Sequence, residues 1–194
     1  MPKFSYQALS LIALLLLQVE AQAAPSCKNE RNEVLVSTEK NKFGHKALKA
    51  SIKINASPKL VWEAITAHRE SDPDVAFSKI TYISESEKVL EQKYVSLPVL
   101  GATTCTLHLN EELYKRIDYH LTKSDRISAF EGSWILSSQD GDSTELELTN
   151  HLKLHMPIPQ KIVDAFSAPK LKARLAHVKQ LAEAKRQTQI ASRD

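Results

Sequence analysis

Residues 144–166, TELELTNHLKLHMPIPQKIVDAF, contain the change of period that decides the fold. From 144 to 154 apolar and polar residues alternate, with leucines and Asn150 on one face and mostly charged residues on the other. This alternation predicts a strand with one buried face and one wet face. After two prolines the apolar residues recur at helical spacing, which predicts an amphipathic C-terminal helix that ends near residue 186 and is broken or kinked near Pro169.

The preceding sequence predicts an antiparallel sheet. Period-two segments follow one another at hairpin-like intervals, separated by polar breaks such as Asp140-Gly141-Asp142. Two earlier strands flank a turn at Gly44, and Ser57-Pro58 opens a short helix that ends before a loop or a second short turn near Pro73. The expected strands cover residues 34–36, 47–54, 77–85, 88–97, 103–113, 115–122, 126–137 and 144–154.

Three segments in this order resemble the START-like helix-grip superfamily, also called the polyketide cyclase, dehydrase and lipid-transport group (SRPBCC). They are INASPKLVWEAIT (54–66), FEGSWILSSQDGDSTELELTNHL (130–152) and PIPQKIVDAF (157–166). The resemblance covers residues 45–186 and implies an α+β helix-grip fold, in which a curved antiparallel β-sheet wraps around a long C-terminal α-helix with short helices after the first strands. It also implies an apolar cavity between sheet and helix that holds a hydrophobic small molecule or lipid.

Strand parity selects the side chains expected to face this cavity. If Phe130 and Trp134 point inward, Glu131 points outward, and an inward Tyr119 likewise sends His120 to the surface. We expect a cavity of a few hundred Å³, at the low end of ligand sites. Plain packing of the aromatic rings and a structural hydrogen bond for Asn150 are the alternatives. The expected ligand-binding residues are Trp62, Tyr94, Tyr119, Phe130, Trp134, Leu148, Asn150 and Phe166.

An enzyme of the same fold, such as a cyclase or hydratase, is the alternative function. In that case Tyr119, Asn150 and Glu111 would polarise an apolar substrate. A third alternative is an interaction domain with a filled core. The sequence has no HExxH, GxSxG, GxGxxG or P-loop motif, so we expect no metal, no nucleotide and no other cofactor. The seven histidines, among them His108, His120, His151, His155 and His177, are expected to be solvated.

The N-terminus has the order of a secretory signal peptide. Lys3 precedes an apolar run centred on residues 11–17, and Ala21-Gln22-Ala23 forms a small-x-small cleavage site. Retention as a membrane anchor is the weaker alternative, because Gln18 interrupts the run well short of the roughly 20 apolar residues needed to span a bilayer. We therefore expect export, to the periplasm or out of the cell.

The predicted domain organisation has four parts. Residues 1–23 form the signal peptide, 24–44 an extension with one extra strand, 45–186 the START-like domain and 187–194 a polar tail. Export to an oxidising compartment favours a disulfide between the only two cysteines, Cys27 and Cys105, although two unpaired thiols remain the alternative.

The small net charge of +3 does not favour nucleic acid as a partner. The basic residues are concentrated in the C-terminal helix at 160–186, which carries a net charge of +5. Such a face is commonly a solvated helix surface, but it also suggests peripheral contact with an anionic membrane, for which Lys172, Arg174 and Lys179 are the candidate residues.

Overall fold

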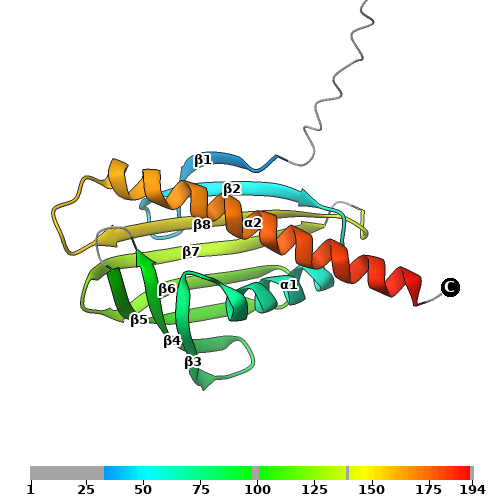
Figure 1. The fold of residues 1–194 in the computed structure, drawn as a ribbon, viewed down its shortest axis with the longest axis horizontal. Helices are drawn as coiled ribbons and strands as arrows, with labels where there is room; N and C mark the ends of the chain where they lie inside the picture. Colours follow the sequence, from blue (N-terminus) through cyan, green and yellow to red (C-terminus); the bar gives the residue numbers. More distant parts are fainter. Residues whose placement is uncertain (1–32, 98–100, 139, 193–194) are drawn as a thin grey trace, which may run out of the picture. The chain divides into compact units, whose positions relative to one another are not determined.

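The computed structural model describes residues 33–97, 101–138 and 140–192, which form an eight-stranded antiparallel sheet with two helices on one face (Figure 1). The predicted signal peptide and Cys27 lie outside these residues. Across the sheet the strand order is β1-β2-β8-β7-β6-β5-β4-β3. The strands are β1 (Leu35–Lys40), β2 (Lys46–Ile54), β3 (Val75–Ile83), β4 (Glu87–Leu97), β5 (Gly101–Glu112), β6 (Arg116–Ser124), β7 (Ile127–Ser138) and β8 (Thr144–Leu154).

The predicted meander is confirmed strand by strand from β3 to β8. Each of these strands pairs with its sequence neighbour in antiparallel register. The clean alternation of β8 has the expected cause, since Leu146, Leu148 and Leu154 are buried on the inner face. The earlier hairpin β1–β2 joins the meander through β2, which pairs with β8.

One helix, α1 (Pro58–Ser71), connects β2 to β3. Pro58 occupies the first helical turn, where its missing N–H costs no hydrogen bond, and Pro73 forces the preceding Asp72 into an extended conformation that ends the helix. The described residues contain one helix at this place and not the several short helices expected, and the predicted turn is formed by Pro73 and Asp74. The fold otherwise matches the expected helix-grip architecture.

The C-terminal helix α2 (Gln160–Ala191) is longer than expected and continuous. The helix runs through Pro169 without the break that was one of the two expected outcomes there, and it ends at Ala191 and not near residue 186. Pro169 is exposed and removes one hydrogen bond to the exposed Ala165 carbonyl, a group that water can satisfy. The buried stripe on both sides of this position holds the helix on the sheet, and its residues are Val163, Ser167, Leu171, Leu175, Val178 and Ala182.

No helix among the described residues is long and apolar enough to cross a membrane.

A row of three residues in register fixes how β6, β7 and β8 pack on their inner face. Tyr119 on β6 pairs with Gly132 on β7, which pairs with Asn150 on β8. The Tyr119 hydroxyl reaches across the glycine to lie 2.9 Å from Asn150 Oδ1 and 3.1 Å from the carbonyl oxygen of Thr149. A Cβ at position 132 would lie 2.4 Å from the Tyr119 hydroxyl, so this crossing requires glycine.

Gly132→Ala should therefore destabilise the fold, because its methyl group would also lie 2.1 Å from the backbone oxygen of Thr149. We expect a loss of about 1–3 kcal/mol in the free energy of unfolding, the usual cost of overpacking a core. Urea denaturation of the variant measures it, with Ser128→Ala, an exposed position on the same strand, as the control. Equal stability of the two variants would contradict the crossing.

Candidate functional site

A cavity of about 80 Å³ lies between the inner face of the sheet and the two helices. Most of its wall is apolar, with contributions from all six strands of the meander, β3 to β8, and from Ile65 on α1. Its polar side chains come mainly from the helices and from the segment that joins α1 to β3. They are His68, Arg69, Asp72, Gln92 and Arg174.

Five of the predicted ligand-binding residues line this cavity: Tyr94, Tyr119, Phe130, Trp134 and Leu148. A smaller cavity of about 30 Å³ is lined by Asn150 and Phe166, and it shares Tyr94, Phe130 and Arg174 with the larger one. Trp62 lines neither of the two. It is buried on α1 and meets the ring of Tyr114 edge-on, 6.0 Å between centroids.

The cavity is smaller than the few hundred Å³ expected from the sequence because aromatic side chains fill the space. The ring of Phe130 packs edge-on against Tyr94 and against Tyr119, both with centroids 5.6 Å apart. Phe166 does not contribute to this filling, since half of its surface is exposed at the helix start. Two of these rings, Tyr94 and Phe130, line both cavities and lie between them.

Arg174 is the central polar group of the site. Its Nη2 atom lies 3.1 Å from Asp72 Oδ2 and 3.5 Å from Asp74 Oδ2, while its buried Nε has no hydrogen-bond partner in the structure. Lys170, one turn earlier on α2, lies 3.0 Å from Asp74 Oδ1. Burial alone would lower the pKa of Arg174, but Asp72 and the other neighbours raise it, so the guanidinium remains charged.

These ion pairs correct the prediction that Arg174 belongs to a basic outer face. Other cations of α2 also contact protein groups, since Lys179 donates to the carbonyl of Lys53 and Lys185 lies 3.2 Å from Glu63 Oε2. Arg186 donates to the carbonyl of Asn55. Contact with an anionic membrane therefore stays a prediction without support from the structure.

His68 on α1 forms the second polar group beside the cavity. Its Nδ1 lies 3.0 Å from Nδ1 of His177 on α2, and its Nε2 lies 3.8 Å from Asp72 Oδ2. The side chain is only 5% exposed. Burial, with a further contribution from the charge of Arg174, lowers the pKa of His68 to about 4, so the imidazole is neutral at physiological pH.

The tyrosines of the cavity wall hydrogen-bond to protein partners. The Tyr94 hydroxyl donates to Gln92 Oε1 at 3.0 Å, and Gln92 in turn donates to Ser78 on the edge strand. Burial raises the pKa of both Tyr94 and Tyr119 well above the ordinary value, which keeps the phenols protonated. They serve as hydrogen-bonding groups in the wall and not as bases.

Glu111, proposed as a cavity acid for an enzyme, is held by cations instead. Its Oε2 lies 2.6 Å from Lys88 Nζ and its Oε1 lies 3.5 Å from Arg69 Nη1. Glu111 lies at the end of β5 and is not among the residues that line the cavity.

Cys105 lies on the inner side of β5 and is 1% exposed. It carries a free thiol, and the predicted disulfide is not observed, with Cys27 outside the described residues. Burial raises the pKa of this thiol to about 12.

The outward direction of Glu131 follows the predicted parity, but its exposure does not. Glu131 and His151 are buried on the outer face of the sheet because the loop between β1 and β2 covers them through Asn41 and His45. The expectation that the histidines are solvated is therefore wrong for His151, and it is also wrong for His68, which is buried on α1. Parity assigns a face of the sheet but does not reveal what covers that face.

Neither Arg174 nor His68 was predicted to line the cavity, although the spacing of both residues along their helices contains a signal. Arg174 lies three residues after Leu171 and four before Val178, and His68 lies three after Ile65. Both therefore occupy the buried stripes of their helices.

Comparison with known proteins agrees with this architecture. A START superfamily protein from Mycobacterium smegmatis is 14% identical, with a TM-score of 0.61 over 71% of this chain and 97% of that one. A STAR-related lipid transfer protein from Xanthomonas axonopodis is 16% identical (TM-score 0.56, 78% of this chain and 98% of that one). The Zhui aromatase/cyclase from Streptomyces sp. R1128 is 15% identical (TM-score 0.58, 71% and 93%).

No protein-family model matches the sequence, and no curated protein matches it significantly. The likeness is therefore one of structure, and it shows that the chain has the START-like helix-grip fold.

The depressed pKa of His68 predicts a dependence of stability on pH. The unfolded chain takes up a proton at this histidine below about pH 6.5, whereas the folded protein does not until about pH 4, so the free energy of unfolding should fall as the pH is lowered through this interval. His68→Leu removes the titration and should reduce the fall. Urea denaturation at about pH 7 and about pH 4.5 measures both proteins, with His155→Ala, an exposed histidine, as the control. An unchanged pH dependence in His68→Leu would refute the assignment.

Proposed function

We propose that this START-like chain binds an apolar small molecule or lipid that carries a hydrogen-bond-accepting oxygen. The observation that carries the proposal is the apolar cavity beside a buried guanidinium, Arg174, whose Nε has no hydrogen-bond partner. A buried unpaired donor is costly, and a ligand oxygen placed against it would remove that cost.

The charges around Arg174 specify the polar part of the ligand. Asp72 and Asp74 lie within 3.5 Å of the guanidinium, and Lys170 adds a second cation beside Asp74. Two carboxylates thus face two cations, so the ligand needs to supply an acceptor but not a full compensating charge. A hydroxyl, carbonyl or carboxylate oxygen on an apolar body fits this arrangement.

The size of the cavity requires that the protein open to admit such a ligand. A volume of about 80 Å³ is well below the roughly 300–1,000 Å³ of sites for larger small molecules. The two cavities adjoin at Tyr94, Phe130 and Arg174, so a shift of the Phe130 ring would join them. The joined space extends to Phe166, which is half exposed and marks the entrance in this proposal.

In this proposal the ion pairs of Asp72 and Asp74 stabilise the closed state and break when the cavity opens. They connect the segment after α1 to Arg174 and Lys170 on α2, and Asp74, Lys170 and Arg174 line the smaller cavity together with Phe166. Separation of these pairs would release the segment after α1 and the start of β3 from α2, while α1 itself stays in contact with α2 through His68 and His177. The names of the lipid transfer and aromatase/cyclase neighbours agree with a cavity for hydrophobic molecules, and the groups expected of a cyclase, Tyr119 and Asn150, are hydrogen-bonded to each other.

Filling the cavity tests the proposal. Leu107 is buried on β5 and lines the space, so Leu107→Trp should occupy it and weaken binding of a fluorescent fatty acid at least tenfold. Leu113→Trp, which adds the same ring at an exposed position just after β5, should bind like the wild type. Fluorescence titration measures affinity, and circular dichroism confirms that both variants fold.

Equal affinity in the two variants would show that the fatty acid does not enter the cavity. Native mass spectrometry of the purified wild-type protein, followed by solvent extraction, identifies any apolar molecule that it retains.

We further propose that the chain is exported and cleaved after Ala23. The support is the order of a cation, an apolar run and a small-x-small site in residues 1–23. Expression of the full chain in its own cell type should yield a mature protein that begins at Ala24, detected by intact mass. Recovery of the uncleaved chain from the cytoplasm would refute export.

A further inference from the structure

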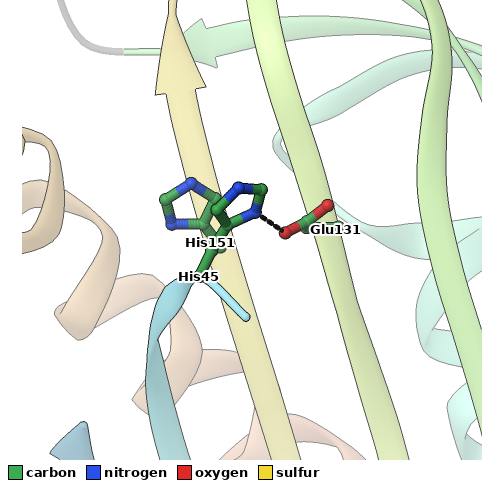
Figure 2. A group of neighbouring side chains, drawn as sticks. All are labelled: His45, Glu131 and His151. Carbon is green, nitrogen blue, oxygen red and sulfur yellow. Dashed lines mark hydrogen bonds and ion pairs between the residues drawn. The ribbon is translucent and has the colours of Figure 1, made fainter. Parts of the chain in front are cut away.

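A second group of side chains lies on the outer face of the sheet, on the side away from the cavity. Figure 2 shows the imidazoles of His45 and His151 beside the carboxylate of Glu131. One potential ligand atom of each residue lies within 4.8 Å of those of the other two. Because they are separated by as many as 106 residues in the sequence, no local motif reveals them.

The fold brings these residues together by two routes. Glu131 on β7 and His151 on β8 are direct partners in the antiparallel register, so their outward side chains are neighbours. His45 arrives from the loop between β1 and β2, whose backbone is closed by a hydrogen bond from Asn41 N–H to the His45 carbonyl at 2.9 Å. The Asn41 side chain accepts in return from the His45 N–H at 3.0 Å, which fixes the loop over Glu131.

Neighbouring groups already orient two of the three side chains. His151 Nδ1 lies 2.9 Å from the carbonyl oxygen of Lys46, which only accepts, so Nδ1 carries the proton and Nε2 carries the lone pair. Asn41 Nδ2 donates to Glu131 Oε1 at 2.7 Å. A histidine that donates its other N–H to a carbonyl and a carboxylate that is itself hydrogen-bonded are the usual supports of metal ligands.

We propose that His45, Glu131 and His151 bind one divalent transition-metal ion of the zinc type. Zinc ligands at about 2.0–2.2 Å in a tetrahedral arrangement lie about 3.4 Å from one another. His45 Nδ1 and Glu131 Oε1 are now 2.5 Å apart, as a hydrogen-bonded pair. When the ion binds, the proton between them would move to His45 Nε2, and the distance between the two atoms would increase by about 1 Å.

The three side chains differ in burial and therefore in how far they can move to bind an ion. The side chain of Glu131 is 10% exposed and His151 is 8% exposed, so they form a fixed base, whereas His45 is 53% exposed on its loop and can adjust. The two imidazole rings are 4.9 Å apart between centroids. Two imidazole nitrogens and one carboxylate oxygen suit zinc better than the hard cations magnesium and calcium, and they leave a fourth position for water.

Metal binding to purified, metal-free protein tests the site. We expect calorimetry with Zn²⁺ to show one ion per chain, and Co²⁺ to give the visible absorption of a tetrahedral complex. His45→Ala, at an exposed loop position, and His151→Asn, which keeps a donor for the Lys46 carbonyl, should each weaken Zn²⁺ binding at least tenfold. His155→Ala, an exposed histidine four residues after His151, should leave it unchanged.

Three outcomes would overturn the proposal. The first is a folded wild-type protein that binds no Zn²⁺ in calorimetry. The second is binding that persists at full affinity in both His45→Ala and His151→Asn, and the third is an equal loss in His155→Ala, which would indicate coordination by surface histidines in general. Circular dichroism of each variant separates loss of ligands from loss of fold.

Discussion

The packing of α2 on the inner face of the sheet is the constraint on which the rest of the structure depends. Leu175, Val178 and Ala182 on α2 are completely buried, as is Leu146 on β8 beneath the helices. A straight helix cannot fill the concave face of a curved sheet on its own, and side chains must occupy what remains. In this chain aromatic rings and the side chains of α1 occupy most of that space, and the cavity is the part that remains unfilled.

Arg174 shows that this packing is not optimised for stability alone. A charged side chain on the buried stripe of a helix must be desolvated, and even a good ion pair often only offsets that cost. An apolar residue of similar volume at this position, with neutral residues in place of Asp72 and Asp74, would fill the core without the cost of desolvating charged groups. The retention of a guanidinium with two carboxylates, and with one N–H unpaired, is understandable if the site has a polar binding role.

The sequence predicted the parts of the structure that depend on local periodicity. The alternation in β8 and the turns of the meander determined the strands, and parity correctly turned Phe130 inward and Glu131 outward. Periodicity did not reveal that Pro169 would be accommodated, because tertiary packing on both sides of the proline outweighs one lost hydrogen bond. It also gave no account of Glu131 and His151, whose burial depends on a loop that is distant in sequence and folds over the outer face.

The pairing of β2 with β8 has a consequence for the order in which the chain folds. The strands β3 to β8 form from hairpins between sequence neighbours, and β1–β2 is a further local hairpin. Lys53, however, pairs with Glu145, so the pairing of β2 with β8 closes a loop of about 90 residues. The chain loses the conformational entropy of this loop before the contacts between the two strands stabilise it. During synthesis the N-terminal hairpin emerges first and must wait for the last strand. Until then the edge of β2 is unpaired, and a chain that stops before β8 has no means to complete the sheet.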